Sequence, residues 1–110
     1  MNKPGIEPNL AATMLRRAEL NPARIALIFE EQELRYDEFG ERVRRLSTLL
    51  RSGGVCVGDR VGYLGLNHPV LLETMFAAQA LGAIFVPILY VTLVLRLGII
   101  IFRMENMFLR

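Results

Sequence analysis

The sequence predicts an α/β fold, in which a hairpin is followed by a helix–strand–helix–strand series with a partly parallel sheet. Apolar residues recur at helical spacing over residues 37–52. Two short and almost continuously apolar runs, at residues 60–66 and 83–88, flank a second helical segment. Two strands joined by one helix need a right-handed crossover, which makes them parallel members of one sheet. The 110 residues suffice for one modest domain or for part of a larger one.

The first predicted elements are a short helix and the hairpin. Asn9 is a suitable N-cap for a helix over residues 10–20. Residues 25–29 form an apolar run of strand length, a charged turn follows at 31–32, and a second extended piece covers 34–36. These two extended pieces are predicted to pair as a hairpin.

The clearest predicted helix begins at Asp37, which stands at an N-cap position, and is ended by the glycine pair at 53–54. Its apolar residues are spaced so that they share one face, which we expect to be buried. That face consists of Phe39, Val43, Leu46, Leu49 and Leu50.

The other face of this helix carries alternating charges. Glu38 with Arg42, and Glu41 with Arg45, are spaced as i,i+4 ion pairs in the favourable order, with the acid first. The basic cluster that also includes Arg44 is therefore interpreted as a solvated and paired face rather than as an anion-binding site.

Residues 60–88 are predicted to form a strand, a helix and a second strand. Residues 60–66 have the composition of a buried strand, Pro69 lies close to the first position of a helix over 70–81, and Gly82 is a candidate C′ residue. A further strand begins at residue 83. We expect one shared core formed by Leu46, Leu49, Val61, Leu64, Met75, Phe76 and Phe85.

Composition excludes several classes of protein. The formal net charge of +2 is too small and too evenly mixed to indicate a nucleic-acid binder, although the sequence pI is about 9.1. The one cysteine cannot form an intramolecular disulfide and has no CxxC partner, which disfavours a structural zinc site. Residues 1–10 lack the apolar stretch of an export signal. We therefore expect a cytoplasmic protein.

Three residues are candidates for chemistry, and the sequence around each one favours a structural role. His68 stands between Asn67 and Pro69, which indicates a turn or helix start rather than a metal ligand. Cys56 lies between two valines and is predicted to be a small packing residue. Asp59 is expected to stabilise its own turn through an Asx hydrogen bond. The sequence thus predicts no catalytic, cofactor-binding or metal-binding residue in this chain.

Residues 21–87 resemble a known family over their whole length. The segment NPARIALIFEEQELRYDEFGERVRRLSTLLRSGG is similar to its entry hairpin and first long helix. The segment GVCVGDRVGYLGLNHPVLLETMFAAQALGAIFVP is similar to its "GDRV" turn and strand, its Asn-x-Pro helix start and its "LGA…VP" step into a strand. The family is that of the AMP-forming acyl-CoA synthetases, and within it the overall sequence pattern most resembles that of the fatty-acid–CoA ligases. The chain thus resembles an N-terminal fragment of the large adenylate-forming domain.

The resemblance implies a parent reaction that converts a carboxylic acid, ATP and coenzyme A into acyl-CoA, AMP and pyrophosphate, with magnesium. It also implies that the catalytic parts lie later in the family's sequence: a phosphate-binding loop ending in lysine, a glutamate for magnesium, an aspartate for the ribose and a lysine for adenylation. No residue of this sequence matches them, so we expect no ATP, magnesium or coenzyme A site here, and an inactive chain.

The resemblance divides the chain into residues 1–20, a leader with a short helix; 21–87, a partial N-terminal subdomain; and 88–110, a divergent apolar tail. We attribute the tail to a shifted reading frame, with a mis-set gene end or a fused fragment as alternatives. Because the tail is rich in β-branched residues and poor in charge, we expect it to promote self-association. A chain ending at Pro87 is then expected to be more soluble than the whole.

Two other hypotheses about function come from the same residues. In one, the chain is a small membrane-associated protein anchored by residues 84–102, whose apolar side chains outweigh Arg96 on an insertion scale but whose length is short for a span. In the other, the chain is a stand-alone α/β interaction module, a fold class that hosts many binding functions.

Overall fold

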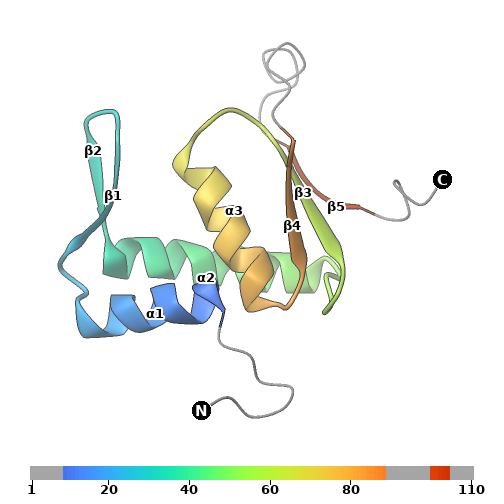
Figure 1. Ribbon diagram of the computed structural model, residues 1–110, viewed down its shortest axis with the longest axis horizontal. Helices are drawn as coiled ribbons and strands as arrows, with labels where there is room; N and C mark the ends of the chain where they lie inside the picture. The colour runs from blue at the N-terminus through green and yellow to red at the C-terminus, as the bar shows by residue number, and fades with distance from the viewer. Residues whose placement is uncertain (1–8, 89–99, 105–110) are drawn as a thin grey trace.

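The computed structural model describes residues 9–88 and 100–104, and it confirms the predicted α/β class (Figure 1). The elements in chain order are α1 (Leu10–Leu20), β1 (Ile25–Phe29), β2 (Gln32–Arg35), α2 (Tyr36–Ser52), β3 (Arg60–Leu64), α3 (Pro69–Ala80), β4 (Ile84–Ile88) and β5 (Ile100–Met104).

The main sheet has three strands in the order β4–β3–β5. β3 and β4 are parallel and are joined by α3, as the sequence predicts. Figure 1 shows α3 running beside β4, with α1 on the other side of α3. α2 crosses α3 and continues toward the sheet, where Leu50 packs against the cluster that contains Val61. β5 is antiparallel to β3 and was not predicted, because it lies within the segment 88–110 that was interpreted as a foreign tail. Residues 89–99 of that segment lie outside the described part of the chain.

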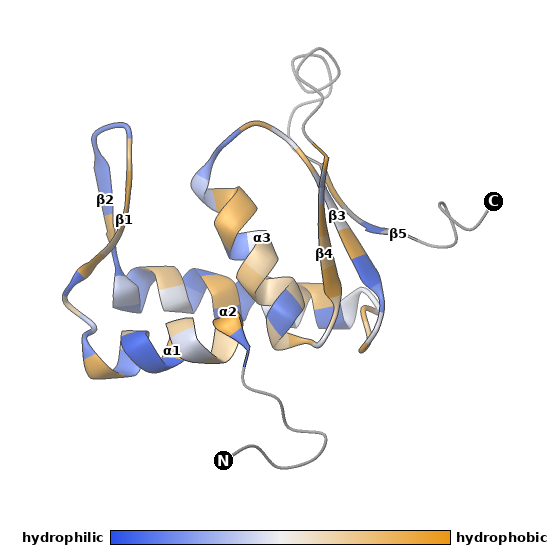
Figure 2. Ribbon diagram, viewed as in Figure 1, coloured by the Kyte–Doolittle hydropathy of each residue, from blue (hydrophilic) through white to orange (hydrophobic). Residues whose placement is uncertain are grey.

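The hairpin β1–β2 forms a separate two-stranded sheet. Its turn lies one residue earlier than predicted, because Glu30 adopts a left-handed φ of 55° and Phe29 pairs directly with Gln32. β2 therefore begins at Gln32. Figure 2 shows that the hairpin turn is hydrophilic, whereas β4 and much of α3 are hydrophobic.

The start of α2 differs from the prediction. Arg35, and not Asp37, is the N-cap residue, because β2 runs directly into the helix and the Tyr36 N–H already donates to the carbonyl oxygen of Arg24 at 2.8 Å. The Glu38 carboxylate accepts from the Arg35 N–H at 3.1 Å, and Asp37 pairs with the Arg35 guanidinium at 2.7 Å. Acidic side chains in the first turn of a helix also stabilise it through the helix dipole.

The other helix ends follow the prediction closely. The Asn9 side chain accepts from the Ala12 N–H at 2.9 Å and so caps α1. α2 ends at Ser52, directly before Gly53. α3 begins at Pro69, the predicted first position, and is followed after Leu81 by Gly82 with a φ of 74°.

The buried residues form two hydrophobic clusters that meet at α3. The first contains Met14, Phe39, Val43 and Ala77, and the second contains Val55, Val61, Ala78 and Ala83. Within the predicted core set, Val61 and Leu64 are buried, whereas Leu46, Met75, Phe76 and Phe85 are half-buried.

Leu49 was predicted to be buried, and this is wrong: it is 68% exposed. Viewed down α2, Ser47 lies about 80° to one side of Phe39 and Leu49 about 80° to the other side. α3 packs on the Ser47 side, where the serine is buried and its hydroxyl donates to the Ala77 carbonyl oxygen at 3.2 Å. The buried face of α2 is therefore rotated away from Leu49.

Arg42 pairs with a different acid from the one predicted. Its guanidinium lies 3.3 Å from Glu73 on α3, whose side chain is only 9% exposed, while Glu38 is used at the start of α2. The second predicted pair, Glu41 with Arg45, is confirmed at 3.1 Å and is exposed on both sides. The Arg42–Glu73 pair thus joins two helices, whereas the Glu41–Arg45 pair lies along one.

Replacing these two arginines is expected to have unequal effects. Arg42→Ala leaves the Glu73 carboxylate buried without its guanidinium, which we expect to lower the free energy of unfolding by about 1–3 kcal/mol. The matched variant Arg45→Ala removes an exposed pair, with an expected loss of about 0.5 kcal/mol or less. Urea unfolding followed by circular dichroism measures both. Equal losses would contradict the interhelical role of Arg42.

Tyr63 is fully buried at the end of β3, and its ring packs against Gly65. The hydroxyl donates to the Leu66 carbonyl oxygen at 2.7 Å, and burial raises the pKa of this hydroxyl above its ordinary value of 10.0. A Cβ atom on Gly65 would lie 2.7 Å from the Tyr63 hydroxyl oxygen. The glycine is therefore needed for the close approach of the ring.

Gly65→Ala is expected to destabilise the chain by about 1–3 kcal/mol, because the buried Tyr63 ring must move to admit a methyl group. Gly53→Ala is the control, since its Cβ would meet the nearest atoms at 3.5 and 3.6 Å, and we expect a change within about 0.5 kcal/mol. Chemical denaturation of both variants tests this. A Gly65→Ala variant as stable as Gly53→Ala would disprove the steric argument.

Candidate functional site

The three candidate residues for chemistry lie at opposite ends of β3. Cys56 and Asp59 occupy the turn before the strand, and His68 caps α3 beyond its carboxyl end. Within residues 9–88 and 100–104, no three His, Cys, Asp or Glu side chains come together in a group that could hold a metal ion. The structure thus does not bring these three side chains together.

Asp59 stabilises its own turn, as predicted, but through the N–H of Cys56, three residues earlier, rather than through an Asx hydrogen bond. Its Oδ2 atom accepts from the Cys56 N–H at 2.7 Å, and the same oxygen lies 3.3 Å from Nε of Arg103 on β5. The prediction for Cys56 is wrong, because this side chain is exposed and Val55 is the one that packs in the core. Val55 thus lies inward in this turn, and the next side chain lies outward. The Cys56 thiol lies 3.4 Å from the Gly54 carbonyl oxygen.

His68 starts α3, as the sequence indicates. Its Nδ1 atom accepts from the Val70 N–H at 3.1 Å, so the neutral ring carries its proton on Nε2. The ring centroid lies 5.1 Å from that of Phe29 on β1. One side chain thereby caps a helix and contacts the hairpin.

A pocket of about 270 Å³ opens beside His68 and is the first candidate binding site. It lies between the hairpin and the start of α3. The lining is mainly apolar and comes from β1, from the turn before α3 and from α3 itself: Leu27, Phe29, Asn67, His68, Pro69, Leu71 and Leu72. Such a pocket suits a small apolar group, with Asn67 and His68 as its polar side chains.

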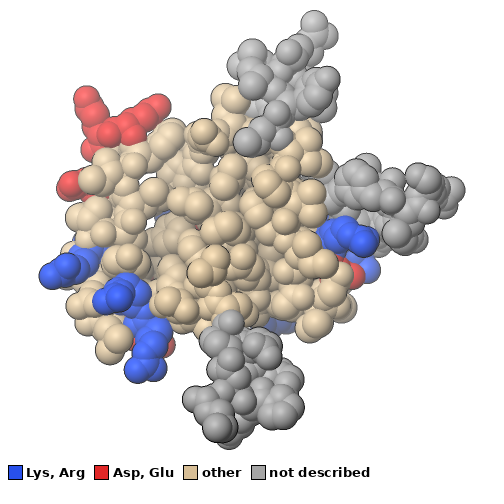
Figure 3. Space-filling model, in the orientation of Figure 1, with Lys and Arg blue, Asp and Glu red and all other residues tan. Residues whose placement is uncertain are grey.

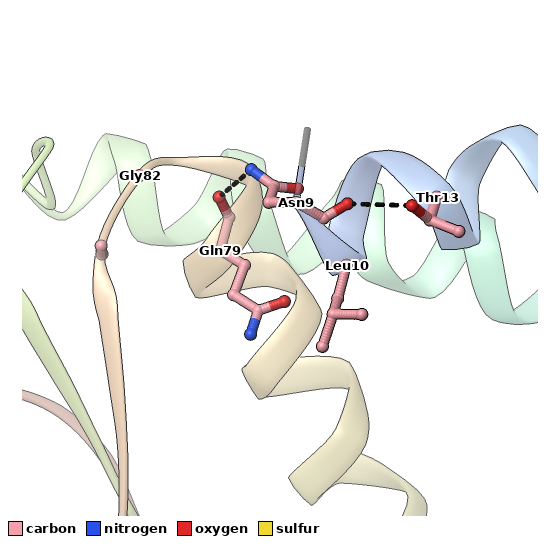
Figure 4. Close-up of a pocket in the computed structure, with 6 residues that line it drawn as sticks. Asn9, Leu10, Thr13, Gln79 and Gly82 are labelled. Carbon is pink, nitrogen blue, oxygen red and sulfur yellow. Dashed lines mark hydrogen bonds between the residues drawn. The ribbon is translucent and has the colours of Figure 1, made fainter. Parts of the chain in front are cut away.

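A second and larger pocket, of about 540 Å³, lies where the start of α1 meets the end of α3 (Figure 4). Asn9 Nδ2 donates to the Gln79 carbonyl oxygen at 3.3 Å, and the Thr13 hydroxyl donates to the Asn9 carbonyl oxygen at 3.2 Å. The Gln79 Oε1 atom is buried and has no hydrogen-bond partner among the described residues. Sequence reasoning missed this pocket, because Asn9 and Gln79 are 70 residues apart.

Charges on the surface are separated by region. The exposed acids Glu30, Glu31 and Glu33 belong to the hairpin, and Figure 3 shows acidic side chains gathered at that corner and basic ones at the corner below it. The middle of this face carries little charge. Among the described residues, no Asp, Glu, Lys or Arg lines either pocket.

The structure also bears on the proposed membrane anchor at residues 84–102. Its described parts are the strands β4 and β5, and residues 89–99 lie outside the described part of the chain. Among the described residues, no helix has the length and apolar character needed to cross a membrane.

Comparison with known proteins identifies a family whose model matches most of this chain. The family model described as "AMP-binding enzyme" matches residues 14–94. Feruloyl-CoA synthase from Amycolatopsis sp is 47% identical over 79 residues, which are 72% of this chain and 16% of that protein. Indoleacetate–CoA ligase from Aromatoleum aromaticum is 41% identical over 66% of this chain and 14% of its own length.

Among solved structures, the N-terminal subdomain of NpsA from Klebsiella oxytoca is similar to this fold. The TM-score is 0.68 at 28% identity, over 72% of this chain and 21% of that chain. The chain thus spans about a sixth of the length of the curated relatives it matches first. The family match extends seven residues beyond Pro87, into the segment that sequence reasoning set apart as a tail.

The capping role of His68 can be tested by two substitutions. His68→Ala removes the acceptor for the Val70 N–H and is expected to cost about 1 kcal/mol of stability. His68→Asn keeps a side-chain acceptor at the N-cap and is expected to recover most of that loss. Thermal and urea unfolding compare the two. If Asn and Ala cost the same, the contact with Phe29 matters more than the cap.

Proposed function

Because the chain belongs to the AMP-binding enzyme family, we propose that it provides the N-terminal scaffold of an acid–CoA ligase. The parent reaction joins a carboxylic acid to ATP as an acyl-AMP and then passes the acyl group to coenzyme A. The observation that carries this proposal is the match of residues 14–94 to the family, together with the likeness of the fold to an N-terminal subdomain. A fatty-acid substrate and a cytoplasmic location belong to the proposal and rest on the resemblance described above.

The described side chains do not fit ATP and magnesium. Phosphate groups are bound by consecutive backbone N–H groups of a glycine-rich loop and by a lysine, and the one lysine of the sequence is Lys3. Magnesium needs carboxylate ligands with free oxygens. The two most buried carboxylates in the described residues are already used, Glu73 by Arg42 and Asp59 by Cys56 and Arg103. We derive no catalytic step from this chain.

The polar groups of the described chain instead support a structural role. Asn9 and His68 cap helices, Asp59 holds a turn, and Ser47 joins α2 to α3. Each bond fixes the position of one element of the α/β scaffold. We therefore propose that this segment supplies packing surfaces to a ligase and that the chain alone does not activate an acid.

Activity measurements on the purified chain test the second part of this proposal. We expect no acid-dependent exchange between ATP and pyrophosphate and no acyl-CoA formation, with ferulate, indoleacetate and a long-chain fatty acid as the acids. The control is an identically purified preparation from cells lacking the gene. Exchange above that control, with any of these acids, would refute the proposed inactivity.

A chimera tests the scaffold role itself. In full-length feruloyl-CoA synthase from Amycolatopsis sp, the matching 79 residues are replaced by those of this chain. We expect a folded enzyme that still forms feruloyl-CoA, because the replaced segment supplies packing rather than reacting groups. The same chimera carrying Val43→Asp, which places a charge in the core, is expected to be inactive. A chimera that folds but makes no feruloyl-CoA would show that the segment does more than support the fold.

A further inference from the structure

We propose that β5 is a closing strand: it covers the second edge of β3 and is held in register by an ion pair between Arg103 and Asp59. β3 lies between β4 and β5, with five residue pairs on each side. From Val61 to Leu64 every residue of β3 is buried. A strand with an open edge would expose a row of unpaired N–H and C=O groups, which is a template for association with another chain.

The pairing places a β5 side chain in the core. Directly opposed residues of an antiparallel pair lie on the same face of a sheet, and Ile101 stands opposite Tyr63. Ile101 is half-buried and packs against the cluster that contains Val61 and Ala78. β5 therefore contributes to the apolar contact between the sheet and α3, in addition to the backbone pairing.

The ion pair joins β5 to the turn that precedes β3. Arg103 stands opposite Val61, and its Nε atom reaches back to Asp59, two residues earlier. The same Asp59 Oδ2 atom that pairs with Arg103 also accepts a hydrogen bond from the Cys56 N–H. Because the two side chains are 40% and 22% exposed, the pair adds little stability by itself, and its main effect is to favour one register. A shift by one residue would turn Arg103 and Ile101 to the opposite face.

This role changes one sequence-based expectation. The residues after Pro87 were expected to be foreign to the body and to promote self-association. With β5 paired to β3, the outer edges of the described sheet are that of β5 and that of β4, where Pro87 offers no N–H to a further strand. Loss of β5 would expose the edge of the buried strand β3 instead, so residues 100–104 are expected to reduce association through β3.

Disulfide trapping in the full chain tests the register. Leu64 and Ile100 are directly opposed, so Leu64→Cys with Ile100→Cys, in a Cys56→Ser background, is expected to form a disulfide on mild oxidation of dilute protein. The matched control pairs Leu64→Cys with Ile101→Cys. Neighbouring residues of a strand point to opposite faces, so this pair is expected to crosslink several-fold more slowly. Non-reducing gels and intact mass distinguish a bond within one chain from a bond between two.

Equal crosslinking by the two pairs would overturn the proposed register, and a bond formed only between chains would overturn closure within one molecule. Hydrogen exchange provides a second test with fewer changes to the core. Ile101→Pro removes a backbone donor from β5 and is expected to increase exchange at Val61–Leu64, while amides of the separate β1–β2 sheet keep their protection. Unchanged protection of β3 in this variant would refute the proposal.

Discussion

The fold depends on the packing of α3 between two hydrophobic clusters. Ala77 and Ala78 are both fully buried, yet they belong to different clusters, one with α1 and α2 and the other with the sheet. Neighbouring residues of a helix point about 100° apart, so burying both alanines requires cover on two sides. Their small side chains allow close approach. Two buried polar side chains of the same helix have partners: Glu73 pairs with Arg42, and the Thr74 hydroxyl donates to the Val70 carbonyl oxygen.

Features set by local chemistry could be predicted from the sequence. Asn9 and Pro69 mark helix starts, Gly53 and Gly82 mark helix ends, and Asp59 bonds to its own turn; each effect acts over three or four residues. The parallel pairing of β3 and β4 could also be predicted from the sequence, because a strand–helix–strand segment has few possible topologies. Asp37 was a local signal that misled, because β2 continues directly into α2 and the helix begins at Tyr36.

Features set by contacts between distant residues could not be predicted. Leu49 fits the apolar spacing of α2 as well as its neighbours do, and only the position of α3 decides that Ser47 is buried instead. Contacts between helices also decide that Arg42 pairs with Glu73 rather than with Glu38. The pocket lined by Asn9 and Gln79 likewise exists only because α1 and α3 meet in the fold. For the candidate site, the sequence correctly gave His68 a helix-start role, but the pocket beside it requires β1, which lies about 40 residues earlier in the chain.

The direction of β5 follows from where the chain leaves and re-enters the sheet. Ile88, the last residue of β4, and Ile100, the first of β5, both pair with Leu64, on opposite sides of β3. A strand that starts at the end where its neighbour finishes must run antiparallel to it, so β5 needs no second crossover helix. The β3–β4 pair follows the parallel strand–helix–strand pattern common in α/β domains. β5 instead adds an antiparallel edge strand, an arrangement that mixed sheets commonly use, and it makes β3 the central strand of this sheet.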